Sequence, residues 1–140
     1  MASGAKPVTE VRAAKHEDMP AIRSLISRYP QQLVQQDLPR PVSFVVAVSG
    51  DKIVGCCALQ IYSRRLAELR SLAIDPEFRR LGIAKMLVER CLQRARQRNV
   101  KQVLAVSSET AFFERCGFST FFREKTALFH DLPSKPGSRS

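Results

Sequence analysis

One stretch, from Leu69 to Leu87, constrains the fold more than any other part of the chain. Leu69 to Ile74 is mostly apolar and predicts a strand, which Asp75-Pro76 ends because proline lacks the N–H that a sheet requires. After Gly82, apolar residues recur at helical spacing: Ala84, Leu87, Val88, Cys91, Leu92 and Ala95. The stretch therefore predicts a strand, a cationic turn and an amphipathic helix that begins at Gly82.

The start of this helix is suited to bind a phosphate group. The first N–H groups of a helix have no partner within it and carry partial positive charge. Gly82 lets the backbone approach an anion closely, and Arg79 and Arg80 add cationic donors. An ordinary strand-to-helix turn with surface arginines is the alternative interpretation.

The hexapeptide from Arg79 to Ala84 resembles the pattern Arg/Gln-x-x-Gly-x-Gly/Ala of the GNAT superfamily of N-acetyltransferases. Its place after a strand that ends in Asp-Pro, before a long helix and upstream of the run Phe112–Phe118, strengthens the resemblance. The resemblance implies that this turn holds the pyrophosphate of acetyl-CoA, while backbone groups at the strand end align the pantetheine arm. The cofactor-binding residues implied in this way are Leu72, Ala73, Ile74, Arg79, Arg80, Leu81, Gly82, Ile83, Ala84 and Lys85.

The composition indicates one globular domain, since the chain has 140 residues of which 44% are hydrophobic. No apolar run approaches the roughly 20 residues of a membrane span, and the N-terminus lacks the apolar core of a secretory signal. We therefore expect a cytoplasmic protein that does not contact a membrane. We predict a flexible leader at 1–7, a GNAT domain at 8–130 and a disordered tail at 131–140.

The predicted elements follow the order β-α-α-β-β-β-α-β-α-β-β, which is that of GNAT proteins. Strands are predicted over 8–14, 42–48, 53–62, 66–74 and 101–106, the last one buried, with a final hairpin or strands over 118–129. Helices are predicted to begin near 16, 83 and 107, and a short polar helix or loop over 31–37. We expect an α/β (α+β) GNAT fold in a single domain, with a mixed central sheet of about six to seven strands and about four helices.

Acetyl transfer to an amine requires a proton acceptor, because an amine with a pKa near 8 or above is mostly protonated at neutral pH. Glu68 is the carboxylate that we expect in this role. A period of two puts Glu68, Arg70, Leu72 and Ile74 on one face of their strand, unless a bulge intervenes. A surface glutamate paired with Arg65 or Arg70 is the alternative interpretation.

The segment 67–73 is similar to the equivalent strand of N-acetylglutamate synthases of the bacterial amino-acid acetyltransferase type, and so are 53–59 and 106–113. This resemblance implies that Glu68 is the base and that Ser107, with Ser108 as an alternative, protonates the thiolate. Helix capping explains the serines equally well. For the carboxylates of a glutamate acceptor, Arg70 is the cation that shares a face with Glu68.

Two features depart from the family pattern. Many GNAT enzymes carry a tyrosine acid four residues before the glycine of the Gly-Phe pair, but this chain has Phe113 there, which we expect in the core. Long-form N-acetylglutamate synthases carry an amino-acid-kinase domain before the GNAT domain. The chain has no room for that domain, so we expect a short form without the arginine-binding regulatory region.

Charge and cysteine content weigh against other site types. Although the net charge is +10, the arginines near the helix end at Arg98 suit a helix C-terminus, and aromatic residues do not interleave with them. Nucleic acid is therefore disfavoured as a partner. The four cysteines, Cys56, Cys57, Cys91 and Cys116, lack metal-site spacing, and neither His16 nor His130 completes a site. We expect reduced, mostly buried thiols and no metal, with a nucleophilic cysteine as a minor alternative.

Together these features predict an acetyl-CoA-dependent N-acetyltransferase that acts by direct attack on the α-amine of a small amino acid. L-glutamate is the acceptor that the resemblance implies, as in N-acetylglutamate synthesis for arginine biosynthesis. The alternatives are acetylation of protein N-termini, lysines or another small amine, and a non-catalytic module that binds CoA or nucleic acid. A homodimer is left open.

Overall fold

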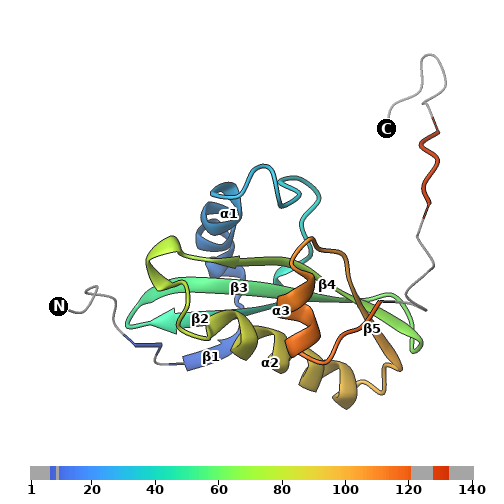
Figure 1. Ribbon diagram of the computed structural model, residues 1–140. Helices are drawn as coiled ribbons and strands as arrows, with labels where there is room; N and C mark the ends of the chain where they lie inside the picture. The colour runs from blue at the N-terminus through green and yellow to red at the C-terminus, as the bar shows by residue number, and fades with distance from the viewer. Residues whose placement is uncertain (1–6, 9, 121–127, 133–140) are drawn as a thin grey trace.

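The computed structural model describes residues 7–8, 10–120 and 128–132. In this part of the chain five strands form one sheet in the order β1-β2-β3-β4-β5 (Figure 1). Their bounds are Glu10–Ala13 for β1, Phe44–Ser49 for β2, Lys52–Ile61 for β3, Leu66–Ile74 for β4 and Gln102–Ala105 for β5. Neighbouring strands are antiparallel except β4 and β5, which run parallel.

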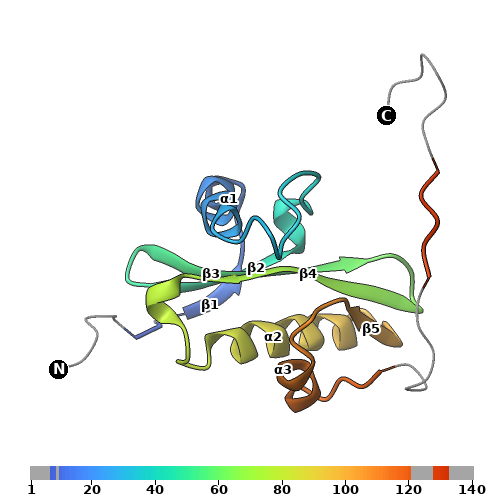
Figure 2. The same cartoon turned by 45° about the horizontal axis from the view of Figure 1, so that its top comes forward.

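The helices divide between the two faces of the sheet. The α-helices are α1 (Met19–Ser27), α2 (Ile83–Gln97) and α3 (Thr110–Arg115), and short 3-10 helices span His16–Asp18, Pro41–Ser43 and Pro76–Phe78. Figure 2 shows α1 on one face and α2 with α3 on the other. A search of the described residues finds no helix long and apolar enough to cross a membrane.

Apolar side chains fill both faces of the sheet. On the α1 side, Ile22 and Ile26 pack with Phe44 and Val46, while on the α2 side Leu87 and Val88 pack with further strand residues. Because both faces are covered, β2 and the centre of β3 are buried without interruption. Adjacent cysteines of β3 obey the expected alternation: Cys56 belongs to the α1-side cluster and Cys57 to the α2-side cluster.

The predicted elements are mostly confirmed, with two corrections. The described part of the chain has five strands and three α-helices, fewer than the six to seven strands and four helices expected. Residues 31–37, predicted as a short polar helix or loop, form turns and bends. The strand at 101–106 was expected to be buried, but Leu104 of β5 is 41% exposed because no described helix covers that face at the sheet edge. Most of the predicted final hairpin and tail (121–127 and 133–140) lies outside the described residues.

A β-bulge interrupts β4 at Ser71. Cys56 pairs with Ala73 and Ala58 with Arg70, so two residues of β4 lie opposite one residue of β3. Ser71 has φ +58°, and its carbonyl oxygen lies 3.4 Å from the Cys56 Sγ. The bulge inverts the alternation of side chains along the strand.

This inversion corrects the face assignment made from the sequence. Before the bulge, Leu69 joins the α2-side cluster, so the alternating side chains of Glu68 and Arg70 point to the α1 face. After it, Leu72 and Ile74 pack with the α2-side cluster. The prediction that these four residues share one face is therefore wrong: the bulge places two on each side of the sheet.

Candidate active site

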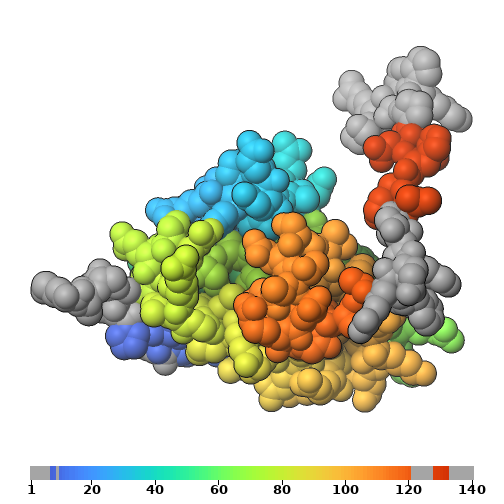
Figure 3. Space-filling view, viewed as in Figure 1, coloured from blue at the N-terminus to red at the C-terminus, as the bar shows by residue number. Residues whose placement is uncertain are grey.

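A cleft of about 960 Å³ opens where β4 and β5 separate. The last paired rung joins Leu69 to Ala105, and beyond it both strands' continuations line the cleft. In the space-filling view the hollow lies between the yellow-green turn after β4 and the orange segment that contains α3 (Figure 3). The volume is in the range of roughly 300–1,000 Å³ that is usual for cofactor and ligand sites.

The start of α2 forms one wall of this cleft. Gly82 occupies the N-cap position with φ +79°, and no side chain caps the helix. A Cβ built at Gly82 would meet nothing within 4 Å, so the space beside the helix start is open. The first-turn N–H groups therefore remain available to a ligand.

All the cofactor-binding residues expected from the sequence line the cleft except Leu81, whose side chain is 55% exposed. Arg79, Arg80 and Lys85 contribute positive charge to the wall beside the helix start, and Arg115 of α3 adds to it. An open glycine, uncapped N–H groups and several cations fit a pyrophosphate. The residues present are therefore compatible with acetyl-CoA.

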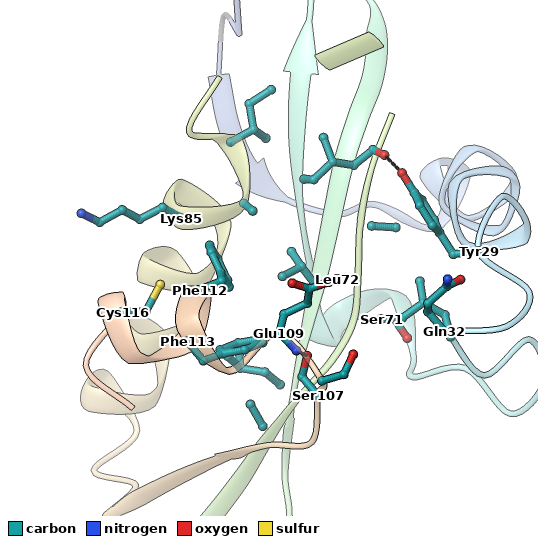
Figure 4. Close-up of a pocket in the computed structure, with 18 of the residues that line it drawn as sticks. Tyr29, Gln32, Ser71, Leu72, Lys85, Ser107, Glu109, Phe112, Phe113 and Cys116 are labelled. Carbon is teal, nitrogen blue, oxygen red and sulfur yellow. Dashed lines mark hydrogen bonds between the residues drawn. The ribbon is translucent and has the colours of Figure 1, made fainter. Parts of the chain in front are cut away.

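Tyr29 connects this wall to the region after α1. Its hydroxyl donates a hydrogen bond to the Ile74 carbonyl oxygen, drawn in Figure 4, and the Arg79 guanidinium lies 5.2 Å from its ring centroid. No local pattern marks Tyr29, because both partners lie far along the chain.

The turn that leads into α2 is fixed by Asp75, which is only 3% exposed. Its carboxylate accepts from the Glu77 N–H at 3.0 Å and lies 3.1 Å from the Lys52 Nζ. Burial alone would raise the pKa of Asp75, but these two partners outweigh it and the pKa is lowered. The carboxylate therefore anchors the turn to β3 in its charged form.

Glu68 lies one rung outside the cleft, opposite Leu104 of β5, with its side chain on the α1 face. The Tyr62 hydroxyl donates to Glu68 Oε1 at 2.5 Å, and this bond is the main cause of a raised Tyr62 pKa. Arg70 lines the cleft and donates to Gln60 Oε1 at 2.7 Å. No local sequence pattern marks Tyr62 or Gln60 as the partners of these two residues.

Ser107 and Ser108 line the opposite wall. The Ser107 Oγ accepts a 2.9 Å hydrogen bond from the N–H of Glu109, the N-cap residue of α3. No side chain caps α3, so the helix-capping role considered for Ser107 and Ser108 is wrong. Figure 4 shows Ser107 and Glu109 just before the start of α3, with Phe112 and Phe113 beside them. Phe113 packs edge-to-face against Phe112 and Phe118 and against the α2-side cluster, but it is half-buried and also lines the cleft. The expected core position is therefore confirmed only in part.

Three of the four cysteines lie in the core, and Cys116 lines the cleft. All four are free thiols; Cys56, Cys57 and Cys91 are buried and Cys116 is half-buried. Burial raises the pKa of Cys56 to about 12, and the neighbouring Cys91 thiol raises that of Cys57. Among the residues that the structure describes, no group of three His, Cys, Asp or Glu side chains could hold a metal ion.

Comparison with known proteins decides the family. A model of the acetyltransferase (GNAT) family matches residues 10–118, which include every described strand and helix. The chain belongs to the GNAT family. As a member of this family it is an N-acetyltransferase, and a solved structure similar to it holds CoA, which is consistent with acetyl-CoA as the acetyl donor.

Individual GNAT relatives agree with this assignment. An uncharacterized N-acetyltransferase of Chlorobaculum tepidum is 32% identical over 122 residues, covering 83% of this chain and 79% of the relative. An amino-acid acetyltransferase of Mycobacterium tuberculosis is 37% identical over 117 residues, covering 78% and 67%. A solved structure from Mycobacterium tuberculosis, in complex with CoA and NLQ, is 36% identical with a TM-score of 0.76, covering 80% and 72%.

Proposed function

We propose that this GNAT enzyme acetylates the α-amine of a small amino acid, with L-glutamate as the first candidate, by direct attack and without an acyl-enzyme. The proposal depends on one observation: the bulge divides β4 into two halves whose even-numbered side chains project to opposite sides of the sheet. The second half lines the cleft with Leu72 and Ile74 on the α2 side, while Glu68 and Arg70 project from the α1 face beside the last paired rung. Donor and acceptor can therefore meet at the point where the strands part.

The cleft would bind acetyl-CoA. The N–H groups at the start of α2, with Arg79 and Arg80, would hold the pyrophosphate, and backbone groups from Leu72 to Ile74 would hold the pantetheine arm. When bound, acetyl-CoA supplies an acetyl group activated as a thioester. Ser107 keeps its hydroxyl proton available, because its Oγ is used as an acceptor by Glu109 N–H. We assign Ser107, with Ser108 as the alternative, to give its hydroxyl proton to the sulfur as the carbon–sulfur bond breaks. The serine would regain a proton from the newly acetylated nitrogen, which must lose its second proton to become an amide.

Residues on the α1 face of β4 would bind and deprotonate the acceptor. Glu68 would take the proton of the acceptor ammonium, directly or through one water molecule, so that the amine nitrogen gains its lone pair. Arg70 would bind the acceptor carboxylate, since a guanidinium pairs well with this group. The name of the Mycobacterium tuberculosis relative, an amino-acid acetyltransferase, supports an amino-acid acceptor. The four free thiols fit the reducing cytoplasm expected from the sequence.

The test is release of CoA thiol from acetyl-CoA across a panel of amines. L-glutamate and other α-amino acids should stimulate release, and 4-aminobutyrate, which lacks the α-carboxylate, should not. Peptides with free N-termini or lysines belong in the same panel. Acetylation of peptides without stimulation by any amino acid would overturn the acceptor class and favour a protein acetyltransferase.

A variant pair tests the base. Glu68→Gln should lower kcat by about 100-fold or more, the usual contribution of general base catalysis, while the Kd for CoA stays unchanged. Glu17→Gln, an exposed glutamate in the 3-10 helix before α1, is the control and should behave as the wild type. Full activity of Glu68→Gln would show that another group removes the proton.

A further inference from the structure

Four polar side chains form a strip on the α1 face of the β3–β4 hairpin: Gln60, Tyr62, Glu68 and Arg70. Gln60 pairs in register with Glu68, and Ala58, two residues earlier on β3, belongs to the α1-side cluster. The alternation of β3 therefore puts Gln60 on this same face. Tyr62 follows the end of β3 at Ile61 and reaches the strip through its hydrogen bond to Glu68. Tyr62 is exposed, and Gln60, Glu68 and Arg70 are half-buried. Figure 2 shows the hairpin extending past α1.

Two hydrogen bonds cross the strip from one strand to the other. The Tyr62 hydroxyl donates to Glu68 Oε1 at 2.5 Å, and the Arg70 NH1 donates to Gln60 Oε1 at 2.7 Å. Each residue that the proposed function assigns to the acceptor thus has one partner from the other strand. Neither partner lines the cleft.

The position of Tyr62 is fixed by the backbone of the turn. The Tyr62 N–H donates to the Leu66 carbonyl oxygen at 3.0 Å, and the Ser63 N–H donates to the same oxygen at 3.2 Å. The hydroxyl therefore comes from an anchored residue, although the side chain is 52% exposed. A tyrosine whose hydroxyl bonded only to water would not require a fixed backbone position.

The bond suits a carboxylate that must act as a base. A carboxylate has about four acceptor positions on its two oxygens, so one bond from Tyr62 leaves room for the acceptor amine or a water molecule. Because the pKa of Tyr62 is raised by this same bond, the phenol keeps its proton and remains a donor at neutral pH.

We propose that Tyr62 and Gln60 are positioning residues of the acceptor site. Tyr62 orients the Glu68 carboxylate toward the acceptor amine, and Gln60 orients the Arg70 guanidinium toward the acceptor carboxylate. This inference rests on the proposed roles of Glu68 and Arg70. It adds that the carboxylate and guanidinium are held at a fixed separation by β3, which favours an acceptor with an amine and a carboxylate on one carbon.

The two bonds should be separable in steady-state kinetics of the full chain with acetyl-CoA and L-glutamate. Tyr62→Phe should lower kcat about tenfold, the value of one hydrogen bond to a charged group, with little change in the acceptor KM. Gln60→Ala should raise the acceptor KM by a similar factor with little change in kcat. Ser63→Ala removes the hydroxyl that accepts from the Arg65 N–H in the same turn, and should alter neither constant.

A double-mutant cycle distinguishes positioning from a structural role. In a Glu68→Gln background, Tyr62→Phe should have almost no further effect on kcat, because its partner is already changed. An equal loss in both backgrounds, or an unchanged kcat for Tyr62→Phe, would overturn the inference while the proposed base stays in place. If Glu68→Gln itself retains full kcat, the proposed base is wrong and the role of Tyr62 falls with it. Thermal unfolding of each variant checks that the fold is retained.

Discussion

The Tyr29 hydroxyl donates a 2.5 Å hydrogen bond to the carbonyl oxygen of Ile74, 45 residues further along the chain. The bond joins the segment after α1 to the last residue of β4, which lines the cleft. The same tyrosine ring lies under the guanidinium of Arg79, a residue assigned to the pyrophosphate. One side chain therefore contacts both the end of β4 and the turn assigned to the pyrophosphate.

Two substitutions at Tyr29 separate these contacts. Tyr29→Phe keeps the ring but loses the bond to Ile74, so the protein should lose about 1 kcal/mol of unfolding free energy with a small rise in the Kd for CoA. Tyr29→Leu also removes the cation–π contact, worth about 0.5–1 kcal/mol, and should raise the Kd for CoA further. Calorimetry and urea unfolding measure both effects. Equal CoA affinity in the wild type and both variants would separate Tyr29 from the cofactor site.

Gly82 and Gly50 form a matched pair of glycines. Both have positive φ, +79° and +65°, and neither would bring a Cβ within 4 Å of another group. Substitution by alanine should therefore cost each about 1–2 kcal/mol of backbone strain and no steric clash. Only Gly82→Ala should also raise the Kd for CoA, by about tenfold or more. Gly50 lies in the β2–β3 turn, so its substitution should leave this Kd unchanged. Similar CoA affinities of the two variants would count against the phosphate site at α2.

Asp18 should make stability depend on pH. Its carboxylate accepts from two Arg12 nitrogens at 2.7 and 3.2 Å and from the Lys15 N–H at 2.7 Å. The Arg12 bond, opposed by burial, lowers the pKa of Asp18 below its usual 3.8. A depressed carboxylate pKa adds stability that is present above the unfolded-state pKa and is lost as the pH falls through the folded-state pKa.

Asp18→Asn should accordingly lower the unfolding free energy at pH 7 by about 1–3 kcal/mol. Its stability should also fall less than that of the wild type as the pH is lowered from about 5 to about 3. Urea unfolding at a series of pH values measures both differences. Asp51→Asn in the exposed β2–β3 turn is the control. Parallel pH curves for the wild type and Asp18→Asn would contradict the prediction.

Thiol labelling should distinguish Cys116 from the buried cysteines. Cys116 lines the cleft and is half-buried, and burial raises its pKa, so iodoacetamide should modify it slowly in the native protein. Cys56, Cys57 and Cys91 should react only after unfolding. Acetyl-CoA should slow the modification of Cys116, as followed by mass spectrometry. Rapid native labelling of Cys57, or unchanged labelling of Cys116 at saturating acetyl-CoA, is the result that we do not expect.

Local patterns allowed much of the fold to be predicted. The apolar run of β4 was predicted at Leu66–Ile74 and has those bounds, and Gly82 was predicted to open α2 and does. Such features depend on nearest neighbours in the sequence. The bulge at Ser71 could not be predicted, because a serine with positive φ has no distinct sequence signature and register arises from pairing with β3.

The cofactor side of the site was accessible from the sequence for the same reason. Its residues lie in one continuous turn and the strand before it, so a short motif could locate them. The partners Tyr62 and Gln60 meet Glu68 and Arg70 only through the β3–β4 register, which no motif records. The catalytic roles of Glu68, Ser107 and Ser108, and the acceptor role of Arg70, stay predictions until the variants are measured.

The extra residue at Ser71 makes the length of β4 matter more than the identity of that serine. If β4 paired residue for residue with β3 and had no bulge, Leu72 and Ile74 would turn toward α1 and half of the strand would exchange its two faces. Inserting one further residue there would have the same effect. Among natural variants of this enzyme, we expect single insertions between Glu68 and Asp75 to be selected against, and position 71 to hold residues that tolerate a positive φ.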